Sequence, residues 1–250
     1  MKISRTGIEN FTRCKRCFWL DAVKKIKPSF GPPFTLNLAV DHLLKNEFDH
    51  YRNLQTVPPI LQAANINLIP FQHPSLNEWR ENFIGVRTHH QATGLDISGA
   101  VDDIWVDANK VLYVVDYKAT AKEGDVSIET DWGVSYKRQV EVYQWLLRQN
   151  SFEVSNTAYF LYTNGIKGNG HFNDRLNFTT KLIPYEGNDG WIEPALLEIN
   201  ELLKSQVPPS ATKDCKQCEY LDKAFNLFFN LKKNLVFRKL KNIKVLSISV

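Results

Sequence analysis

Acidic and basic side chains gather at the ends of two apolar segments in the middle of the chain. Asp102 and Asp103 stand in the first segment, and Asp116 and Lys118 stand at the end of the second. Residues i and i+2 of a β-strand share one face, so Asp116 and Lys118 are expected to point the same way. If a turn at 107–110 pairs the two segments, one of the earlier aspartates lies beside Asp116.

Two carboxylates and an ammonium group at a strand end have the composition of an oxygen-ligated Mg²⁺ or Mn²⁺ site next to a phosphodiester. The carboxylates would hold the ion, and Lys118 would orient water or neutralise charge in the transition state. Asp102 and Asp103 must point to opposite faces, so only one of them can contact the ion. The alternative interpretation is a surface hairpin in which Asp116 and Lys118 form a weak, solvent-exposed pair.

All four cysteines stand in two Cys-x-x-Cys pairs, Cys14 with Cys17 and Cys215 with Cys218. Both thiolates of such a pair can bind one metal from a tight turn, and two pairs make a four-sulfur site suited to Zn²⁺ or an iron–sulfur cluster. Four unrelated free thiols are the alternative. Because almost two hundred residues separate the pairs, the site would clasp the two ends of a domain and is too spread out for a self-contained zinc finger.

The elements that must position these residues follow from the spacing of the apolar side chains. Helical spacing predicts helices, and alternation predicts strands. The order is helix, three-strand meander, helix, two strands, helix, which indicates an α+β fold without an internal repeat. Helices are expected from Ser4 toward Cys14 and over 36–51, 75–83, 132–147 and 190–205; strands are expected over 84–92, 95–107, 111–119, 154–163 and 174–185; residues 53–73 are expected to be irregular.

Length and composition bound the class of protein. The chain has 250 residues, of which 43% are hydrophobic and 23% charged, so it can bury a core as one domain or two small ones, and disorder, collagen and coiled coil are excluded. The net charge of +4 is unevenly distributed, with +6 in each of 1–27 and 221–250 and −8 in 28–220. No apolar run has the length of a signal peptide or a membrane span, so a cytoplasmic protein with reduced thiols is expected.

The motifs resemble those of a known family. The segments Gly99-Ala-Val-Asp102 and Val115-Asp-Tyr-Lys118-Ala-Thr120 are similar to motifs II and III of PD-(D/E)xK nucleases of the RecB type, including AddB and the CRISPR-adaptation exonucleases. Further along, Gln139 and Tyr143 resemble the Gln-x-x-x-Tyr helix of those nucleases. His42 matches the family's histidine on a helix before the sheet. The segment that ends at Asp102, the segment with Lys118 and the helix with Gln139 follow one another in the family's order. Three motifs in this order are more specific than any one of them.

The resemblance implies a restriction-endonuclease-like α+β core with a mixed central sheet flanked by helices. This nuclease core would span 28–206, between an N-terminal Cys-x-x-Cys segment at 1–27 and a C-terminal Cys-x-x-Cys segment with a basic tail at 207–250. The implied site roles are metal binding by His42, Asp102, Asp116 and the backbone carbonyl of Tyr117, orientation of water by Lys118, and positioning of the lysine or the DNA backbone by Gln139 and Tyr143.

Each of these assignments has a competing interpretation. His42 lies opposite the predicted apolar stripe of its helix, so it is either solvated or turned toward a site. Tyr143 with Gln139 could be a core-facing stripe that tolerates one glutamine. Asp103 would face away from the ion or assist it indirectly. The other histidines match nothing in the family and are expected on the surface.

Several nucleases of this type have a Ser-x-x-x-Ile-x-x-Phe/Tyr-x-x-Cys segment, here Ser4 to Cys14, and C-terminal cysteines that clasp a [4Fe–4S] cluster. The resemblance therefore implies such a cluster at Cys14, Cys17, Cys215 and Cys218. The family's usual distribution is one cysteine before the core and three after it, whereas this chain has two and two. Zn²⁺ stays open as the alternative.

We therefore expect a Mg²⁺- or Mn²⁺-dependent deoxyribonuclease, with exonuclease as the expected mode, acting on single-stranded DNA or duplex ends. Its protein partners would be a helicase or other proteins of DNA repair or defence. Two rivals stay open: a catalytically silent nucleic-acid-binding protein of the same fold, and a Zn²⁺-clasped binding module unrelated to nucleases. A shared metal would also draw the two basic ends into a DNA-entry patch.

Overall fold

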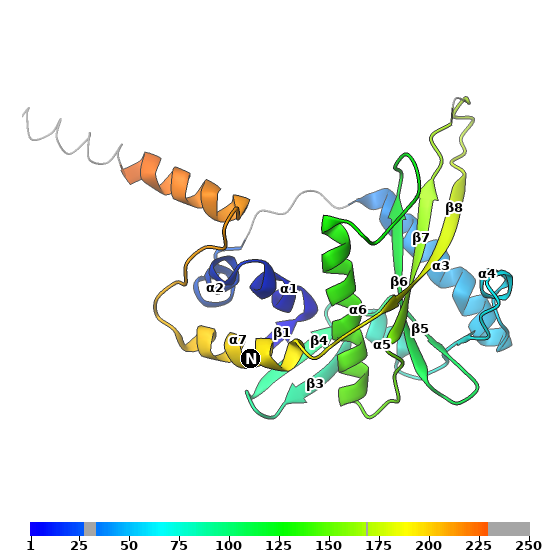
Figure 1. Ribbon diagram of the computed structural model, residues 1–250, viewed down its shortest axis with the longest axis horizontal. Helices are drawn as coiled ribbons and strands as arrows, with labels where there is room; N and C mark the ends of the chain where they lie inside the picture. The colour runs from blue at the N-terminus through cyan, green and yellow to red at the C-terminus, as the bar shows by residue number, and fades with distance from the viewer. Residues whose placement is uncertain (28–33, 169, 230–250) are drawn as a thin grey trace, which may run out of the picture. The chain divides into compact units, whose positions relative to one another are not determined.

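The computed structural model describes residues 1–27, 34–168 and 170–229 (Figure 1). Its strands are β1 (Lys2–Ser4), β2 (Ile69–Pro70), β3 (Val86–His90), β4 (Leu95–Gly99), β5 (Asp103–Val106), β6 (Leu112–Thr120), β7 (Thr157–Gly165) and β8 (Phe178–Glu186). Its helices are α1 (Arg5–Arg13), α2 (Lys15–Lys24), α3 (Thr35–Leu54), α4 (Pro59–Ala63), α5 (Leu76–Arg80), α6 (Asp131–Gln149) and α7 (Ile192–Lys204), and residues 216–229 are also helical.

The strands form two sheets, both of them mixed. One has three strands in the order β1-β4-β3, and the other has five in the order β2-β5-β6-β7-β8. In the larger sheet β6 and β7 are parallel, and the remaining neighbours are antiparallel. A parallel pair needs a crossover connection, which α6 supplies between β6 and β7. The predicted α+β class with mixed sheet and flanking helices is confirmed.

The predicted single strand over 95–107 is wrong. The chain leaves β4 after Gly99 and begins β5 at Asp103, and these strands belong to different sheets. β4 alternates buried and less buried residues, whereas all four residues of β5 are buried, so one continuous pattern does not describe both. At the break, a Cβ on Gly99 would lie 2.8 Å from the Tyr143 ring, so α6 packs directly on the backbone there. The predicted meander is two hairpins in separate sheets.

Helices α3 and α6 pack on opposite faces of the larger sheet (Figure 1). On β6, Val115 and Tyr117 point toward α3, where they share an aromatic core with Phe48 and Trp105, whose rings stack 5.3 Å apart. Successive side chains of a strand alternate between faces, so Asp116 and its even-numbered neighbours point toward α6. The face toward α3 therefore carries the aromatic core, and the face toward α6 carries the side chains of Asp116 and Lys118.

The buried face of α3 differs from the predicted apolar stripe. The apolar residues at helical spacing over 36–51 include Leu36, Val40, Leu43 and Phe48. Val40 and Phe48 are buried, but Leu36 and Leu43 are 59% and 63% exposed. Arg52, which the apolar pattern omits, is 5% exposed. Its burial is made favourable by carboxylate partners described below. A helical wheel that considers only apolar residues therefore predicts the wrong face of α3 to pack against the sheet.

Helix α6 starts at a capped turn and buries its second half. Thr130 Oγ1 accepts a hydrogen bond from Gly133 N at 3.1 Å, which satisfies a free backbone donor of the first turn. Gly133 is needed there because a Cβ would lie 1.7 Å from the carbonyl oxygen of Ile128. Trp132 and Val140 are both among the apolar residues at helical spacing over 132–147. Val140 is fully buried, whereas Trp132 is 75% exposed.

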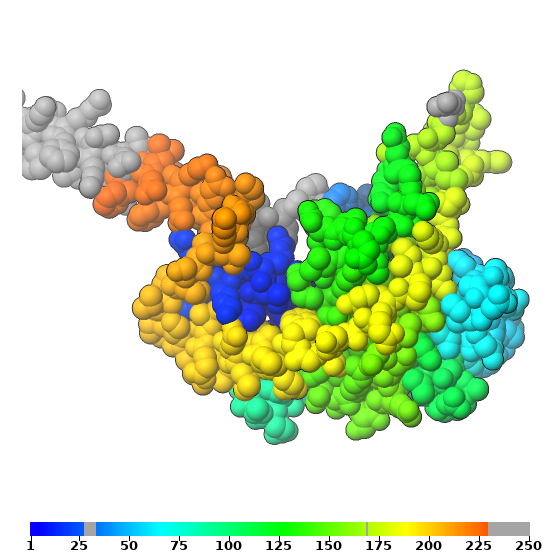
Figure 2. Space-filling view, in the orientation of Figure 1, coloured from blue at the N-terminus to red at the C-terminus, as the bar shows by residue number. Residues whose placement is uncertain are grey.

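The chain divides into two compact units, one of Met1–Glu9 with Phe30–Leu202 and the other of Asn10–Ser29 with Leu203–Val250. The first unit contains both sheets with α3 and α6, and the ends of β7 and β8 nearest their connection project from it (Figures 1 and 2). The second unit contains α2 and the C-terminal helical run. In the described part of the chain, no helix combines the length and apolar character needed to cross a membrane.

Candidate active site

Asp116 and Lys118 share the face of β6 that meets α6. Lys118 Nζ contacts the Asp116 carboxylate, lies 4.6 Å from the centre of the Tyr136 ring, and lies 3.5 Å from Gln139 Oε1. Gln139 Nε2 in turn donates a hydrogen bond to the Tyr143 hydroxyl at 3.0 Å. Residues i and i+4 of a helix are neighbours on its surface, so Gln139 and Tyr143 reach the strand together. The structure thus joins these predicted site residues in one chain of polar contacts.

The Asp116 carboxylate is short of partners. It is fully buried, and apart from the contact of Oδ2 with Lys118 Nζ neither oxygen has a hydrogen-bond partner among the described residues. Burial raises the pKa of Asp116 to about 7; the charge of Asp102 adds to this rise, and the ammonium of Lys118 opposes it. Burying a carboxylate whose oxygens lack hydrogen-bond donors is costly, and the contact with Lys118 leaves Oδ1 without a partner among the described residues. The Asp116 carboxylate therefore suits the ligand set of a divalent ion.

The charge state of Lys118 is set by the same carboxylates. Burial alone would lower the pKa of Lys118, but Asp116 and Asp102 outweigh burial and raise that pKa. Lys118 is therefore an ammonium group at neutral pH. It can neutralise negative charge or donate a hydrogen bond to water, and it is not suited to remove a proton from water.

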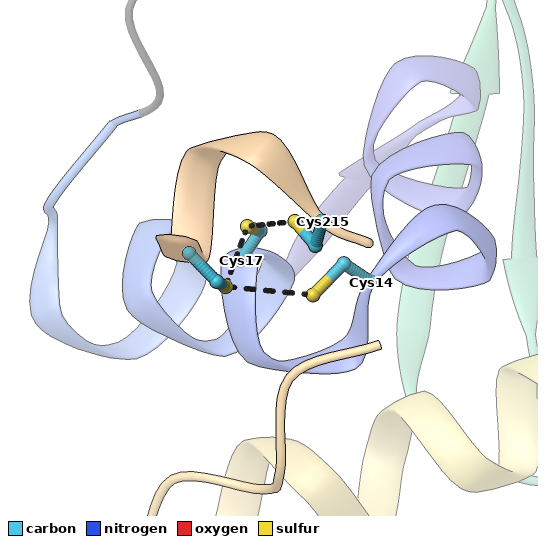
Figure 3. A group of neighbouring side chains, drawn as sticks. Cys14, Cys17 and Cys215 are labelled. Carbon is cyan, nitrogen blue, oxygen red and sulfur yellow. Dashed lines mark hydrogen bonds between the residues drawn. The ribbon is translucent and has the colours of Figure 1, made fainter. Parts of the chain in front are cut away.

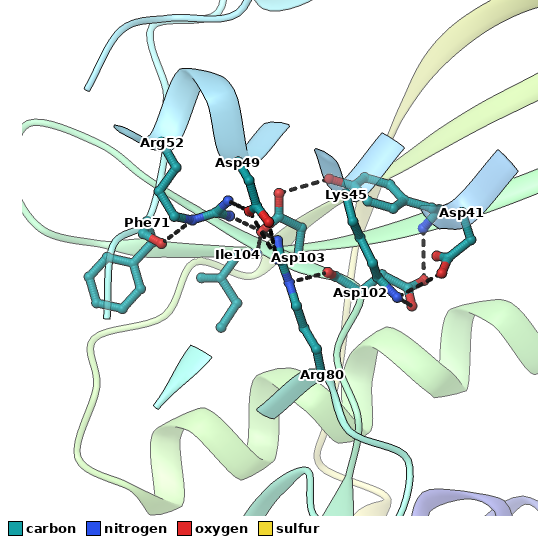
Figure 4. Close-up of polar contacts among 10 residues, drawn as sticks. Asp41, Lys45, Asp49, Arg52, Phe71, Arg80, Asp102, Asp103 and Ile104 are labelled. Atoms are coloured by element: carbon teal, nitrogen blue, oxygen red, sulfur yellow. Dashed lines mark hydrogen bonds and ion pairs between the residues drawn. The ribbon is translucent and has the colours of Figure 1, made fainter. Parts of the chain in front are cut away.

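Asp102 lies directly before β5 at the same end of the sheet (Figure 4). Its Oδ2 accepts a hydrogen bond from the backbone N–H of Tyr117 at 3.0 Å, which fixes the carboxylate beside β6. Its Oδ1 lies 3.6 Å from Lys45 Nζ, and that ammonium lies 2.8 Å from Asp41 Oδ2. A lysine from α3 thus stands between two carboxylates, one from the helix and one from the sheet.

Asp103 points to the other face, as the strand geometry requires. It is completely buried and accepts hydrogen bonds from Arg80 Nη2 at 2.9 Å, from the Tyr117 hydroxyl at 2.7 Å and from the N–H of Ile104 at 2.9 Å. The guanidinium of Arg52 also contacts it. Its oxygens are fully used by donors within the protein, so Asp103 has no capacity left for an ion.

His42 is not brought to these carboxylates. Its side chain is exposed, and Nε2 lies 3.2 Å from Nδ2 of Asn46 on the same helix. Within the described residues, the only His, Cys, Asp or Glu groups whose ligand atoms gather within 4.8 Å in sets of three or more are the four cysteines. The predicted set of His42, Asp102 and Asp116 therefore does not form a ready-made cage.

Asp41, the residue before His42, faces the site instead. On α3, Asn37, Asp41 and Lys45 follow one another at intervals of four, so they lie on one face. Asn37 Nδ2 donates to the carbonyl of Ala119 at 2.9 Å, which holds this face against the end of β6. The family resemblance pointed to His42, and the polar i, i+4 series is the sequence signal for the face of α3 that carries Asp41.

A cavity of about 570 Å³ opens over these residues. Tyr117 and Gln139 line it, while Asp116 lies below the surface. Four cationic side chains outnumber two carboxylates in the lining, which gives the cavity the charge expected of a site for a polyanion. The cations are Arg5, Lys45, Arg80 and Lys118, and the carboxylates are Asp41 and Asp102.

The expectation that the remaining histidines lie on the surface is wrong for His90. Its side chain is 8% exposed, Nδ1 lies 2.8 Å from the Thr93 hydroxyl, and Nε2 lies 2.8 Å from the Glu193 carboxylate. His50, His89 and His171 are exposed, and His73 is half-buried against the Trp79 ring.

The two Cys-x-x-Cys pairs meet, which confirms that the N- and C-terminal cysteines cluster (Figure 3). All four sulfur atoms lie within 4.8 Å of one another, and Cys14 and Cys218 are buried. Burial would raise the pKa of Cys14, but hydrogen bonds to the backbone and to the neighbouring thiols lower it to about 6. The group has the composition of a metal site. Most of the predicted basic tail, residues 230–250, lies outside the described residues.

Comparison with known proteins adds a family to this geometry. A family model described as the PD-(D/E)XK nuclease superfamily matches residues 38–222, a span that includes the site on α3, β5, β6 and α6 and the second cysteine pair. No curated protein matches the chain. Among solved structures, the crystal structure of SSO0001 is similar with 15% identity and a TM-score of 0.39, over 83% of this chain and 79% of that one.

Proposed function

Because the chain belongs to the PD-(D/E)XK nuclease superfamily, we propose that it is a metal-dependent deoxyribonuclease. The observation that carries the proposal is the fully buried Asp116 carboxylate, which lies beside Asp102 and has the ammonium of Lys118 as its one partner among the described residues. Members of this superfamily are typically metal-dependent nucleases. The division into segments 1–27, 28–206 and 207–250 is part of the same proposal.

Asp102 and Asp116 are the proposed carboxylate ligands, with the backbone carbonyl of Tyr117 as a third oxygen. Mg²⁺ commonly keeps several water molecules and binds through one or two carboxylates together with substrate phosphates, so two aspartates at one end of a sheet suffice. When bound, Mg²⁺ or Mn²⁺ would polarise the scissile phosphoryl group and lower the pKa of a water molecule.

The other site residues act on charge and position. Lys118, held as an ammonium by the aspartates, neutralises charge that develops on the phosphate and orients the attacking water. Gln139 holds Lys118 from the helix, and the hydroxyl of Tyr143 fixes the amide of Gln139 by accepting its hydrogen bond. Gln139 and Tyr143 are therefore positioning residues in this proposal.

DNA is the proposed substrate because the cavity lining is net positive. We expect exonuclease action on single strands or duplex ends, in the cytoplasm, together with a helicase or other proteins of DNA repair or defence. The rival that keeps the same fold is a protein that binds nucleic acid without cleaving it. The complete Asp102, Asp116 and Lys118 set favours the enzyme, because clustered carboxylates are costly to keep without a use.

A cleavage assay distinguishes the proposed nuclease from a protein that binds nucleic acid without cleaving it. End-labelled and internally labelled single-stranded and double-stranded DNA is incubated with the full chain in Mg²⁺, in Mn²⁺, and in either metal with excess chelator. We expect degradation that requires the metal and stops with the chelator. Binding of DNA without cleavage in both metals would reject the enzyme in favour of the silent nucleic-acid-binding protein.

Asp41 and His42 distinguish two ways of completing the metal site from α3. Asp41 faces the cavity and is linked through Lys45 to Asp102, whereas His42 is exposed away from the cavity lining. We expect Asp41→Ala to raise the Mn²⁺ concentration needed for half-maximal cleavage by about tenfold, as loss of a supporting ligand does. His42→Ala is the matched control and is expected to leave that concentration within about twofold. The reverse ranking would restore His42 as the ligand.

A further inference from the structure

The two Cys-x-x-Cys pairs are built alike, each at the start of a helix. Cys14 is the extended residue before α2, and Cys17 lies in the first turn; Cys215 precedes the helical run 216–229, and Cys218 lies in its first turn. In both pairs the carbonyl of the first cysteine accepts a hydrogen bond from the N–H four residues later, at 3.0 and 2.9 Å. Both helix starts therefore present two thiols from one tight turn.

The sulfur atoms are spaced as they are around a single ion (Figure 3). Cys17 Sγ lies 3.3 Å from Cys218 Sγ and 3.5 Å from Cys215 Sγ, and Cys14 Sγ lies 3.7 Å from Cys218 Sγ. A tetrahedral Zn²⁺ site with Zn–S bonds of about 2.3 Å puts neighbouring sulfurs about 3.8 Å apart. From this agreement we infer that the four cysteines bind one Zn²⁺ in a tetrahedral four-thiolate site.

The [4Fe–4S] cluster that the family resemblance implies does not fit this spacing. In such a cluster each thiolate binds a different iron, so a body of four iron and four sulfide ions stands between the sulfurs. All four Sγ atoms lie within 4.8 Å of one another, which leaves no room between them for that body. A cluster would have to push both helix starts apart, whereas one ion needs no such movement.

The charges around the sulfurs suit a site with a net charge of −2, which is that of one Zn²⁺ with four thiolates. The pairs read Cys-Lys-Arg-Cys and Cys-Lys-Gln-Cys, so three of the four intervening residues are cationic. One of them, Arg16, forms two hydrogen bonds with the Asp222 carboxylate at 3.0 and 2.7 Å, which ties the two segments together next to the site. Helix N-termini also favour thiolates through their partial positive charge.

The metal content of the purified protein tests this inference, and it does so independently of any nuclease activity. The full chain is produced in medium containing both iron and zinc and purified without oxygen, so that a cluster would survive. We expect one zinc per chain, iron and acid-labile sulfide at trace levels, and a colourless protein. A brown protein with four iron and four sulfide per chain would overturn the inference, and so would a protein with neither metal.

Replacement of the ion gives a second measurement on the unaltered chain. Co²⁺ introduced in place of Zn²⁺ is expected to give the intense visible bands of a tetrahedral thiolate site; weak bands of an octahedral ion would contradict it. Cys218→Ser is expected to lower the bound zinc to a tenth or less, while Gln217→Ser, next to it in the same turn, keeps the full amount. If both variants keep the full amount, the four-thiolate site is wrong.

Discussion

Lys118→Ala is expected to lower the rate of metal-dependent DNA cleavage by a factor of about 10²–10³, the loss seen when a group that stabilises transition-state charge is removed. The ammonium contacts Asp116 and is held protonated by Asp116 and Asp102. Without it, the charge that develops on the phosphate loses its nearest cationic side chain from β6. Steady-state kinetics on labelled DNA should show a lower kcat with a smaller change in KM.

A lysine elsewhere on the same hairpin provides the matched control. Lys110 lies in the turn between β5 and β6, at the opposite end of β6 from Lys118, and has a φ of 70°. Lys110→Asn removes a positive charge while keeping a residue that tolerates this backbone conformation. Its cleavage rate is expected to stay within about twofold of the unaltered protein. Equal rates for Lys118→Ala and the unaltered protein would reject the role assigned to Lys118.

Short-range spacing predicted the part of the site that lies on regular elements. The i, i+2 relation put Asp116 and Lys118 on one face of a strand, and the i, i+4 relation put Gln139 and Tyr143 on one face of a helix. These relations hold whenever the element forms, because the backbone geometry fixes them. The longer helices and strands were predictable for the same reason, whereas the short elements β1, α4 and β2 were not, and α4 and β2 lie in the region expected to be irregular.

The rotation of α3 was not predictable from apolar residues. Arg52 takes a buried position because it binds Asp103, and Leu36 and Leu43 are left exposed. Neighbouring residues on a helix differ in direction by about 100°, so a shift of one residue exchanges His42 for Asp41. The rotation of α3 depends on the ion pair between Arg52 and Asp103, which are about fifty residues apart in the sequence. A local sequence pattern does not contain such a long-range contact.

The break between β4 and β5 was missed for a related reason. Alternation continues from Leu95 through Gly99, and only the meeting of Gly99 with Tyr143 marks where the chain leaves the smaller sheet. The clustering of the cysteines, by contrast, followed from their chemistry alone. Identical short motifs at distant positions predict a shared ion without any knowledge of the path between them.

Asp103→Ala is expected to lower the free energy of unfolding by about 3–5 kcal/mol, the cost of breaking a buried ion pair by removing one partner. Asp103 is completely buried, and it is the buried one of the two carboxylates that Arg52 and Arg80 share. Without it, the two buried guanidinium groups keep only Asp49 as a carboxylate partner among the described residues. The Asp49 side chain is 38% exposed. It also removes the acceptor of the Tyr117 hydroxyl. Urea unfolding followed by tryptophan fluorescence measures the loss.

A substitution of the neighbouring Asp102 distinguishes an effect on catalysis from an effect on stability. Asp102→Ala removes a carboxylate that lines the cavity, so we expect cleavage to be lost while the unfolding free energy changes far less than in Asp103→Ala. Asp125→Ala, at a side chain 97% exposed with a lysine 3.6 Å away, serves as the surface control and should shift stability by no more than about 0.5 kcal/mol. If Asp103→Ala were as stable as this control, the buried charge cluster would not be what fixes the rotation of α3, and the assignment of Asp41 to the site would lose its structural basis.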